Sequence, residues 1–260
     1  MIIGVPKEIK LQEHRIGLTP DSVKVLTDKG HEVLVQTNGG FEAGFTDENY
    51  KNAGGKIISS AEEIFRKAEL IVKVKEPQES EVKLIRESQI IYTYLHLAAA
   101  KKLTEGLIKS KSICIAYETV TDDNGRLPLL APMSAVAGRM SIQAGAHSLE
   151  KNQKGRGLLL GGAPGVEPAN IVILGGGVVG ENAAIIATGM RGKVYVVDKS
   201  KERLKQLHEM FGDKIIPTES NKTDLKKLIS NCDLLVGGVL IPGAEAPKLV
   251  TKEMIKSMKR

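Results

Sequence analysis

The sequence predicts an α/β protein with two domains, each built on a parallel β-sheet. Short apolar segments typical of strands alternate with helical segments along the whole chain, which is the pattern of parallel βαβ units. Several strand segments are apolar throughout, as expected when helices cover both faces of a sheet. A chain of 260 residues is long enough to form two modest domains.

The first half contains five expected strands, at residues 2–5, 32–36, 70–74, 89–94 and 112–116. Helices are expected between them. Thr19 before Pro20 predicts a helix start, because threonine caps the first turn and proline suits the first helical position. Asp47 and Ser60 are expected to cap two more helices, with Glu63 completing a capping box after Ser60.

The second half repeats the alternation after a turn-rich segment at 122–130 and a long expected helix at 131–151, whose small residues suit close packing. A segment rich in glycine and proline then leads to strands at 170–174, 193–197, 214–216 and 233–237 and helices at 178–190, 200–211, 222–231 and 250–258. We therefore place the domain boundary near residue 130. The first domain covers 1–130 and the second covers 131–260, including the long helix.

Composition excludes several functional classes. The net charge of +6 is spread along the chain without a basic stripe, and aromatic residues make up only 3%, so nucleic acid is not an expected partner. No apolar run approaches the roughly 18–20 residues of a membrane span, and the N-terminus lacks the features of a secretory signal. Cys114 and Cys232 lie far apart, which indicates free thiols in the cytoplasm. No metal site is expected.

A glycine motif indicates the cofactor class. Gly175, Gly177 and Gly180 fit G-x-G-x-x-G directly after an expected strand and at the start of a helix. Such a turn often serves packing alone, but here the next strand also ends in an acid, Asp198, and the three features agree. They predict a Rossmann domain that binds a dinucleotide, with the pyrophosphate at the helix start near Val178.

Asp198 favours NAD over NADP. Its carboxylate suits the hydroxyl pair of a ribose and repels a 2′-phosphate. Lys199, Lys201 and Arg203 follow directly, and these cations leave NADP as an alternative. They also fit an ordinary exposed first helical turn.

The first half carries charged residues near expected strand ends, where open α/β sheets bind ligands. Lys73 and Lys75 lie near the end of one strand and His96 follows the next. A lysine there can hold a carboxylate or polarise a carbonyl, and a histidine can move protons near neutral pH. Arg15, in the loop after the first strand, can grip a carboxylate with two hydrogen bonds. Taken singly, each also fits a structural or surface role.

Together these residues match a family. The chain resembles NAD-dependent alanine dehydrogenase over essentially its whole length, through matching segments at 4–8, 13–15, 72–77, 94–98, 131–134 and 174–180. The NAD-binding first domain of proton-translocating transhydrogenase shares the fold, but the set of Arg15, Lys75 and His96 fits the dehydrogenase better. The resemblance implies a flavodoxin-like first domain, a Rossmann second domain and a homo-oligomer, since relatives are hexameric.

The resemblance also implies roles for individual residues. Arg15 and Lys75 would bind L-alanine or pyruvate, and His96 would be the acid/base, with Lys75 assisting catalysis and ammonium as the other product. The implied NAD contacts are Met133, Ser134, Gly175, Gly177, Val178, Val179, Gly180, Asp198 and Arg203.

Members of this family continue past the position of Arg260 with further Rossmann strands and a catalytic aspartate. We therefore expect the second domain to be incomplete at its C-terminal end. Two functional hypotheses follow: an alanine dehydrogenase, or a non-catalytic NAD-binding remnant or transhydrogenase-like subunit.

Overall fold

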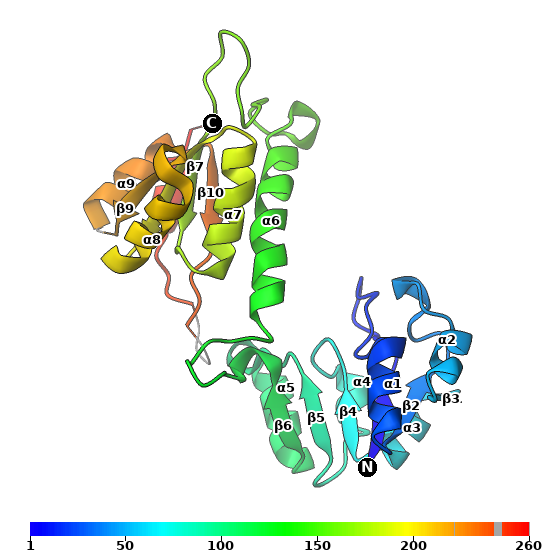
Figure 1. Ribbon diagram of the computed structural model, residues 1–260. Helices are drawn as coiled ribbons and strands as arrows, with labels where there is room; N and C mark the ends of the chain where they lie inside the picture. Colours follow the sequence, from blue (N-terminus) through cyan, green and yellow to red (C-terminus); the bar gives the residue numbers. More distant parts are fainter. Residues whose placement is uncertain (221, 242–245, 260) are drawn as a thin grey trace. The chain divides into compact units, whose positions relative to one another are not determined.

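Two compact units make up the chain in the computed structural model, which describes residues 1–220, 222–241 and 246–259 (Figure 1). The first unit is Met1–Leu127 and the second is Pro128–Arg260. Each unit has its own sheet, and every strand pair in both sheets is parallel. The expected α/β class is therefore confirmed.

The first unit is a six-stranded sheet in the order β3-β2-β1-β4-β5-β6. Its strands are β1 (Ile2–Val5), β2 (Glu32–Gln36), β3 (Lys56–Ile58), β4 (Leu70–Val72), β5 (Ile90–Thr93) and β6 (Ile113–Ala116). Its helices are α1 (Pro20–Asp28), α2 (Asp47–Asn52), α3 (Ala61–Lys67), α4 (Glu79–Val82) and α5 (Lys101–Ser110), with short 3₁₀ turns η1 (Phe41–Ala43), η2 (Leu97–Ala99) and η3 (Tyr117–Thr119).

The five expected strands of this unit are all present as β1, β2, β4, β5 and β6. Without β3 their order in the sheet is β2-β1-β4-β5-β6, which is the flavodoxin-like order 2-1-3-4-5. The sixth strand, β3, was not expected. It pairs with β2 at the edge of the sheet and extends the order to 3-2-1-4-5-6. Its segment is only three residues long, which is too short for a recognisable apolar period.

Both faces of this sheet are buried. Val33 and Val35 of β2 pack into one apolar cluster, whereas Leu34 between them packs into another. Successive strand residues point to opposite faces, so these two clusters lie on the two sides of the sheet. This double burial explains why the strand segments read as continuous apolar runs.

Helix starts follow the capping rules with two corrections. The Thr19 hydroxyl accepts the N–H of Ser22, and Pro20 follows at the first position, as predicted. The second helix is capped by Thr46, not by Asp47, because the Thr46 hydroxyl accepts the N–H of Asn49 while the Asn49 side chain accepts the N–H of Thr46. Ser60 caps the third helix as expected, but the Glu63 carboxylate pairs with Lys67 at 2.6 Å and does not complete the expected capping box.

The second unit has a four-stranded sheet in the order β10-β7-β8-β9, which matches the order 4-1-2-3 of a Rossmann sheet's first four strands. Its strands are β7 (Asn170–Leu174), β8 (Lys193–Asp198), β9 (Ile215–Glu219) and β10 (Leu234–Gly237). Its helices are α6 (Ala131–Ser148), α7 (Val178–Gly189), α8 (Lys201–Phe211), α9 (Lys222–Asn231) and α10 (Lys252–Lys256), with 3₁₀ turns η4 (Lys151–Gln153) and η5 (Gly212–Lys214).

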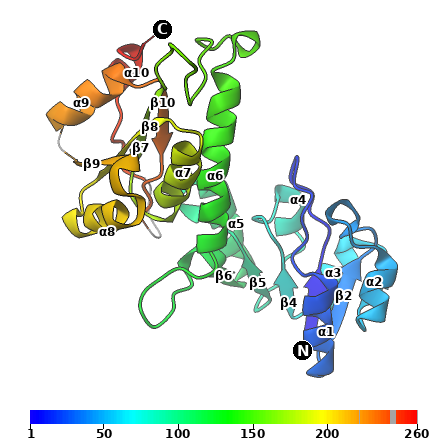
Figure 2. The same ribbon diagram turned by 45° about the horizontal axis from the view of Figure 1, so that its top comes forward.

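The long helix α6 packs along α7, and Figures 1 and 2 both draw the two helices side by side. Glycine makes the close approach feasible: a Cβ atom on Gly138 would lie 2.2 Å from the carbonyl oxygen of Val179. Helix α6 ends at Ser148, three residues before the expected end. Strand β9 runs to Glu219, three residues past its expected end.

Candidate active site

The three residues predicted to handle substrate follow three strands of the first sheet. Arg15 lies in the segment after β1, Lys75 follows β4 and His96 follows β5. The order of the sheet reverses between β1 and β4, which are neighbours. Doubly wound sheets bind ligands outside the carboxyl ends of strands at such a switch point. The fold therefore brings the predicted residues to its expected binding edge.

Arg15 is held by a carboxylate two residues away. Its Nε and Nη2 atoms each donate to the Glu13 side chain at 2.7 Å, and its main-chain N–H donates to the same group at 3.0 Å. These bonds lower the pKa of Glu13 to about 2, and the nearby charge of Lys75 adds to the effect. Glu13 thus holds the charged Arg15 guanidinium in one orientation, and Lys75 lies close enough to interact electrostatically with Glu13.

The two lysines after β4 have different surroundings. Lys73 is fully buried, and its ammonium donates to Glu8 at 3.0 Å and to Glu81 at 2.8 Å. Lys75 is partly exposed, and its ammonium has no hydrogen-bond or ion-pair partner among the residues that the structure describes. Of the two lysines, Lys75 is therefore the one whose ammonium is available to a ligand.

His96 occupies a strained turn at the end of β5. Its φ angle is 51°, in the left-handed region that few side chains adopt. The Glu118 carboxylate secures this turn by accepting the N–H of His96 at 2.6 Å and that of Leu95 at 3.1 Å. The imidazole is exposed and stacks on the Tyr94 ring, with centroids 6.1 Å apart and planes 9° apart. The main chain is thus fixed while the imidazole faces solvent.

Sequence reasoning missed three members of this site: Glu8, Tyr94 and Glu118. Tyr94 stacks on His96 from two positions away in the turn after β5, so its nearness in sequence was the one signal for it. Glu8 and Glu118 bond to residues 65 and 22 positions away, and no local pattern reveals such partners.

The glycine motif lies in the second unit and has the geometry of a phosphate-binding turn. Gly175 has a φ of +96°, and a Cβ on Gly180 would lie 1.8 Å from the Gly175 carbonyl oxygen. A Cβ on Gly177 would meet nothing within 4 Å. The first and third glycines are therefore required by the fold, whereas the second leaves open space beside the turn, which suits a ligand.

The residues around this turn fit a dinucleotide. No side chain caps the twelve-residue helix α7, which begins at Val178 and Val179, so its first N–H groups remain donors for phosphate. At the end of β8 the Asp198 carboxylate accepts the N–H of Gly176 at 2.6 Å and that of Ser200 at 2.8 Å. Each carboxylate oxygen keeps a lone pair for a ribose hydroxyl.

Arg203 braces the glycine turn. Its Nε donates to the Gly176 carbonyl at 2.6 Å, its Nη2 forms an ion pair with Glu181, and its Nη1 donates to Gln206 at 3.2 Å. The guanidinium is neutralised by Glu181 and joins α8 to the turn. The cation that contacts the turn therefore already has a carboxylate partner.

Met133 and Ser134 lie on the first turn of α6. Gly138, one turn further along, packs on the Val179 carbonyl at the start of α7. The structure thus places both predicted residues at the end of α6 that adjoins the start of α7.

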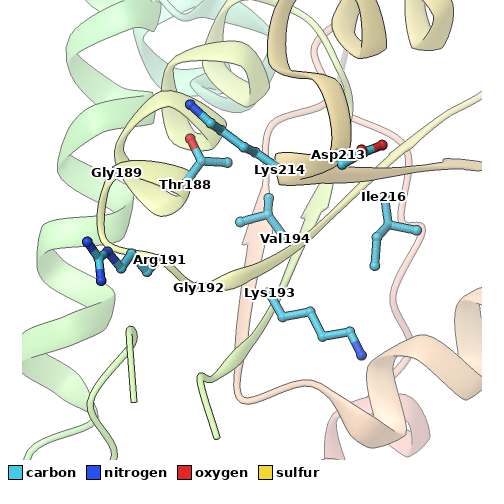
Figure 3. Close-up of a pocket in the computed structure, with 9 residues that line it drawn as sticks. All are labelled: Thr188, Gly189, Arg191, Gly192, Lys193, Val194, Asp213, Lys214 and Ile216. Atoms are coloured by element: carbon cyan, nitrogen blue, oxygen red, sulfur yellow. The ribbon is translucent and has the colours of Figure 1, made fainter. Parts of the chain in front are cut away.

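A cavity of about 530 Å³ lies in the second unit at the amino ends of β8 and β9 (Figure 3). Its lining combines the end of α7, the turn into β8 and the start of β9, and is formed by Thr188, Gly189, Arg191, Gly192, Lys193, Val194, Asp213, Lys214 and Ile216. None of the predicted site residues lines this cavity. The glycine turn follows the carboxyl end of β7, whereas the cavity lies at the amino ends of the strands, so the two are at opposite ends of the parallel strands.

No helix in the described part of the chain is long and apolar enough to cross a membrane. The same residues contain no group of three histidine, cysteine, aspartate or glutamate side chains arranged to hold a metal ion.

Comparisons with known proteins agree with this organisation. Residues 4–137 match the family model described as alanine dehydrogenase/PNT, N-terminal domain, and residues 141–260 match alanine dehydrogenase/PNT, C-terminal domain. An alanine dehydrogenase of Methanococcus maripaludis is 53% identical over 258 residues, covering 99% of this chain and 69% of the relative. One of Halomonas elongata is 50% identical over 259 residues, covering 100% of this chain and 70% of the relative.

Solved structures show the same relationship. An L-alanine dehydrogenase superposes with a TM-score of 0.89 at 48% identity, covering 100% of this chain and 72% of that chain. A transhydrogenase from Sinorhizobium meliloti superposes with a TM-score of 0.80 at 23% identity, covering 100% of this chain and 76% of that one. The second likeness concerns the fold alone.

Proposed function

The chain belongs to the alanine dehydrogenase/PNT family, and we propose that it acts in the NAD-dependent, reversible conversion of L-alanine to pyruvate and ammonium. The observation that carries this proposal is the placement of Arg15, Lys75 and His96 after three neighbouring strands at the switch point of the first sheet. The alternative of a non-catalytic or transhydrogenase-like NAD-binding subunit is not favoured, because relatives near 50% identity are alanine dehydrogenases.

Arg15 and Lys75 bind the substrate in this proposal. The Arg15 guanidinium pairs with the substrate carboxylate, for which its planar, permanently charged group is suited. The Lys75 ammonium, which has no partner in the described residues, points its donors at the carbonyl oxygen of pyruvate. Two cations at one edge also attract an anionic substrate.

His96 moves protons. Loss of a hydride and an amino proton from L-alanine leaves an iminium, and water must then add to its carbon. The His96 imidazole takes a proton from the attacking water and returns it to the amine nitrogen. As the C–N bond of the carbinolamine then breaks, the hydroxyl proton passes to the departing ammonia, which yields pyruvate and ammonium. Its fixed main chain and the stacked Tyr94 ring hold the imidazole ready for both transfers.

The second unit holds the cofactor in this proposal. The residues that would bind NAD are Gly175, Gly177, Val178, Val179, Gly180 and Asp198, with Met133, Ser134 and Arg203 nearby. NAD supplies the hydride acceptor, which is chemistry that no side chain provides. Asp198 selects NAD because its carboxylate suits ribose hydroxyls and repels a 2′-phosphate.

The test is oxidation of NADH that depends on both pyruvate and ammonium, measured together with calorimetric binding of pyruvate. Lys75→Ala should weaken pyruvate binding by at least about tenfold, or ~1.4 kcal/mol. His96→Ala should keep pyruvate binding within about threefold but lose turnover. Lys109→Ala, an exposed lysine of α5, is the control and should change neither. Pyruvate binding unchanged in Lys75→Ala would contradict the proposal.

We also propose that the protein is cytoplasmic and assembles as a homo-oligomer. Two free cysteines, one of them buried, support a reducing compartment. The resemblance to a family with hexameric members supports assembly, which light scattering of the purified chain tests directly.

A further inference from the structure

Three charged side chains are buried together beneath the candidate active site. The Lys73 ammonium is fully buried and lies 3.0 Å from a Glu8 oxygen and 2.8 Å from a Glu81 oxygen, and the two carboxylates are 2% and 3% exposed. Removing such charges from water is costly unless every group finds partners. One ammonium is shared by two carboxylates, so this cluster is more than a simple ion pair.

The two glutamates differ in what else they hold. The second oxygen of Glu81 accepts the N–H of Gln78 at 2.7 Å, three residues away at the start of its own helix. The second oxygen of Glu8 accepts the N–H of Val74 at 2.6 Å and that of Lys75 at 3.3 Å, across more than 60 positions of sequence. Glu81 therefore secures α4, whereas Glu8 joins the segment after β1 to the segment after β4.

Both joined segments carry a substrate-binding cation of the proposed function. Lys75 itself donates its main-chain N–H to Glu8, and Arg15 lies seven positions after Glu8 in the same segment. The Glu8 charge also helps to raise the pKa of Arg15, behind the larger contribution of Glu13. Glu8 is thus the residue through which the two segments are connected at the switch point.

We propose that Glu8 is a positioning residue that sets the spacing between Arg15 and Lys75 for substrate binding. The inference rests on the proposed function of those two cations. Lys73, which Glu81 also holds, fixes the buried Glu8 carboxylate in place. Glu8 in turn fixes the position of the Lys75 main chain.

Glu8→Gln and Glu81→Gln form a matched pair, because each removes one carboxylate from Lys73. Both should lower the midpoint of thermal unfolding. Glu8→Gln should also weaken calorimetric binding of pyruvate by about tenfold, since displacement of a binding group by a fraction of an ångström has effects of this order. Glu81→Gln should stay within about threefold of wild type, and NADH binding should be unchanged in both.

Glu8→Asp is a second variant for the case in which Glu8→Gln fails to fold. It keeps the charge but withdraws the carboxylate by one methylene, so pyruvate binding should weaken while most of the thermal stability remains. Equal pyruvate affinity in folded Glu8 and Glu81 variants would overturn the inference alone. Failure of the wild-type chain to bind pyruvate, or full binding by Lys75→Ala, would overturn the proposed function as well.

Discussion

At the scale of single residues, the charge state of Glu13 is set by Arg15. The two hydrogen bonds from the guanidinium lower the Glu13 pKa from 4.5 to about 2. A carboxyl group whose pKa is lower in the folded state stabilises the fold above its unfolded pKa, and this contribution is lost as the pH falls. The window here runs from about 4.5 down to about 2.

Glu13→Gln should therefore lower the urea midpoint at pH 6, and the difference from wild type should shrink as the pH falls from 4.5 towards 2. The effect at pH 6 should be about 1 kcal/mol or less, because Arg15 is 42% exposed and water screens the pair. Urea titrations at several pH values measure it. A difference that grows on acidification would show that Glu13 is not the group responsible.

The same scale shows where prediction from sequence ends. Lys73 and Lys75 stand two positions apart with the same chemistry, and both lie near the end of a predicted strand. Only the fold reveals that Lys73 is enclosed by Glu8 and Glu81, which come from other segments. Residue type and position along a strand predicted that both lysines lie near the carboxyl end of β4, but not which of them is buried.

At the scale of elements, strands and helices were predictable because their signals are local. Apolar runs, glycine turns and capping residues located most of the elements to within a few residues at either end, among them β1, β2 and β7 without error. Two errors have local physical causes. Strand β3 is too short to show an apolar period. Thr46 caps α2 in place of Asp47 because Thr46 and Asn49 form a capping box.

The glycine turn permits a prediction that separates folding from binding. Gly177 has a φ of −68°, and a Cβ atom at this position would meet nothing within 4 Å. Gly177→Ala should therefore fold with a loss of about 1 kcal/mol or less. It should nevertheless weaken NADH binding at least about tenfold, because the methyl group occupies the space expected for the pyrophosphate.

Gly180→Ala is the matched comparison. Its methyl group would lie 1.8 Å from the Gly175 carbonyl oxygen, so the helix must shift and stability should fall by about 1–3 kcal/mol. Fluorescence titration with NADH and thermal unfolding distinguish the two variants. Unchanged NADH affinity in Gly177→Ala would remove the turn from the proposed cofactor site.

At the scale of the whole molecule, the two units have separate sheets and separate apolar cores, and the proposed ligands divide between them. A ligand protects the backbone amides of the unit that binds it, since binding to the folded form alone stabilises that form by about 2.7 kcal/mol at a hundredfold excess over Kd.

Hydrogen exchange on the full chain should therefore show NADH protecting 174–181 and 198–200, and pyruvate protecting 13–15 and 73–76. Asp198→Ala should abolish the first pattern and leave the second. Protection by NADH confined to the first unit would contradict the assignment of the cofactor to the glycine turn, because no residue of that turn belongs to the first unit.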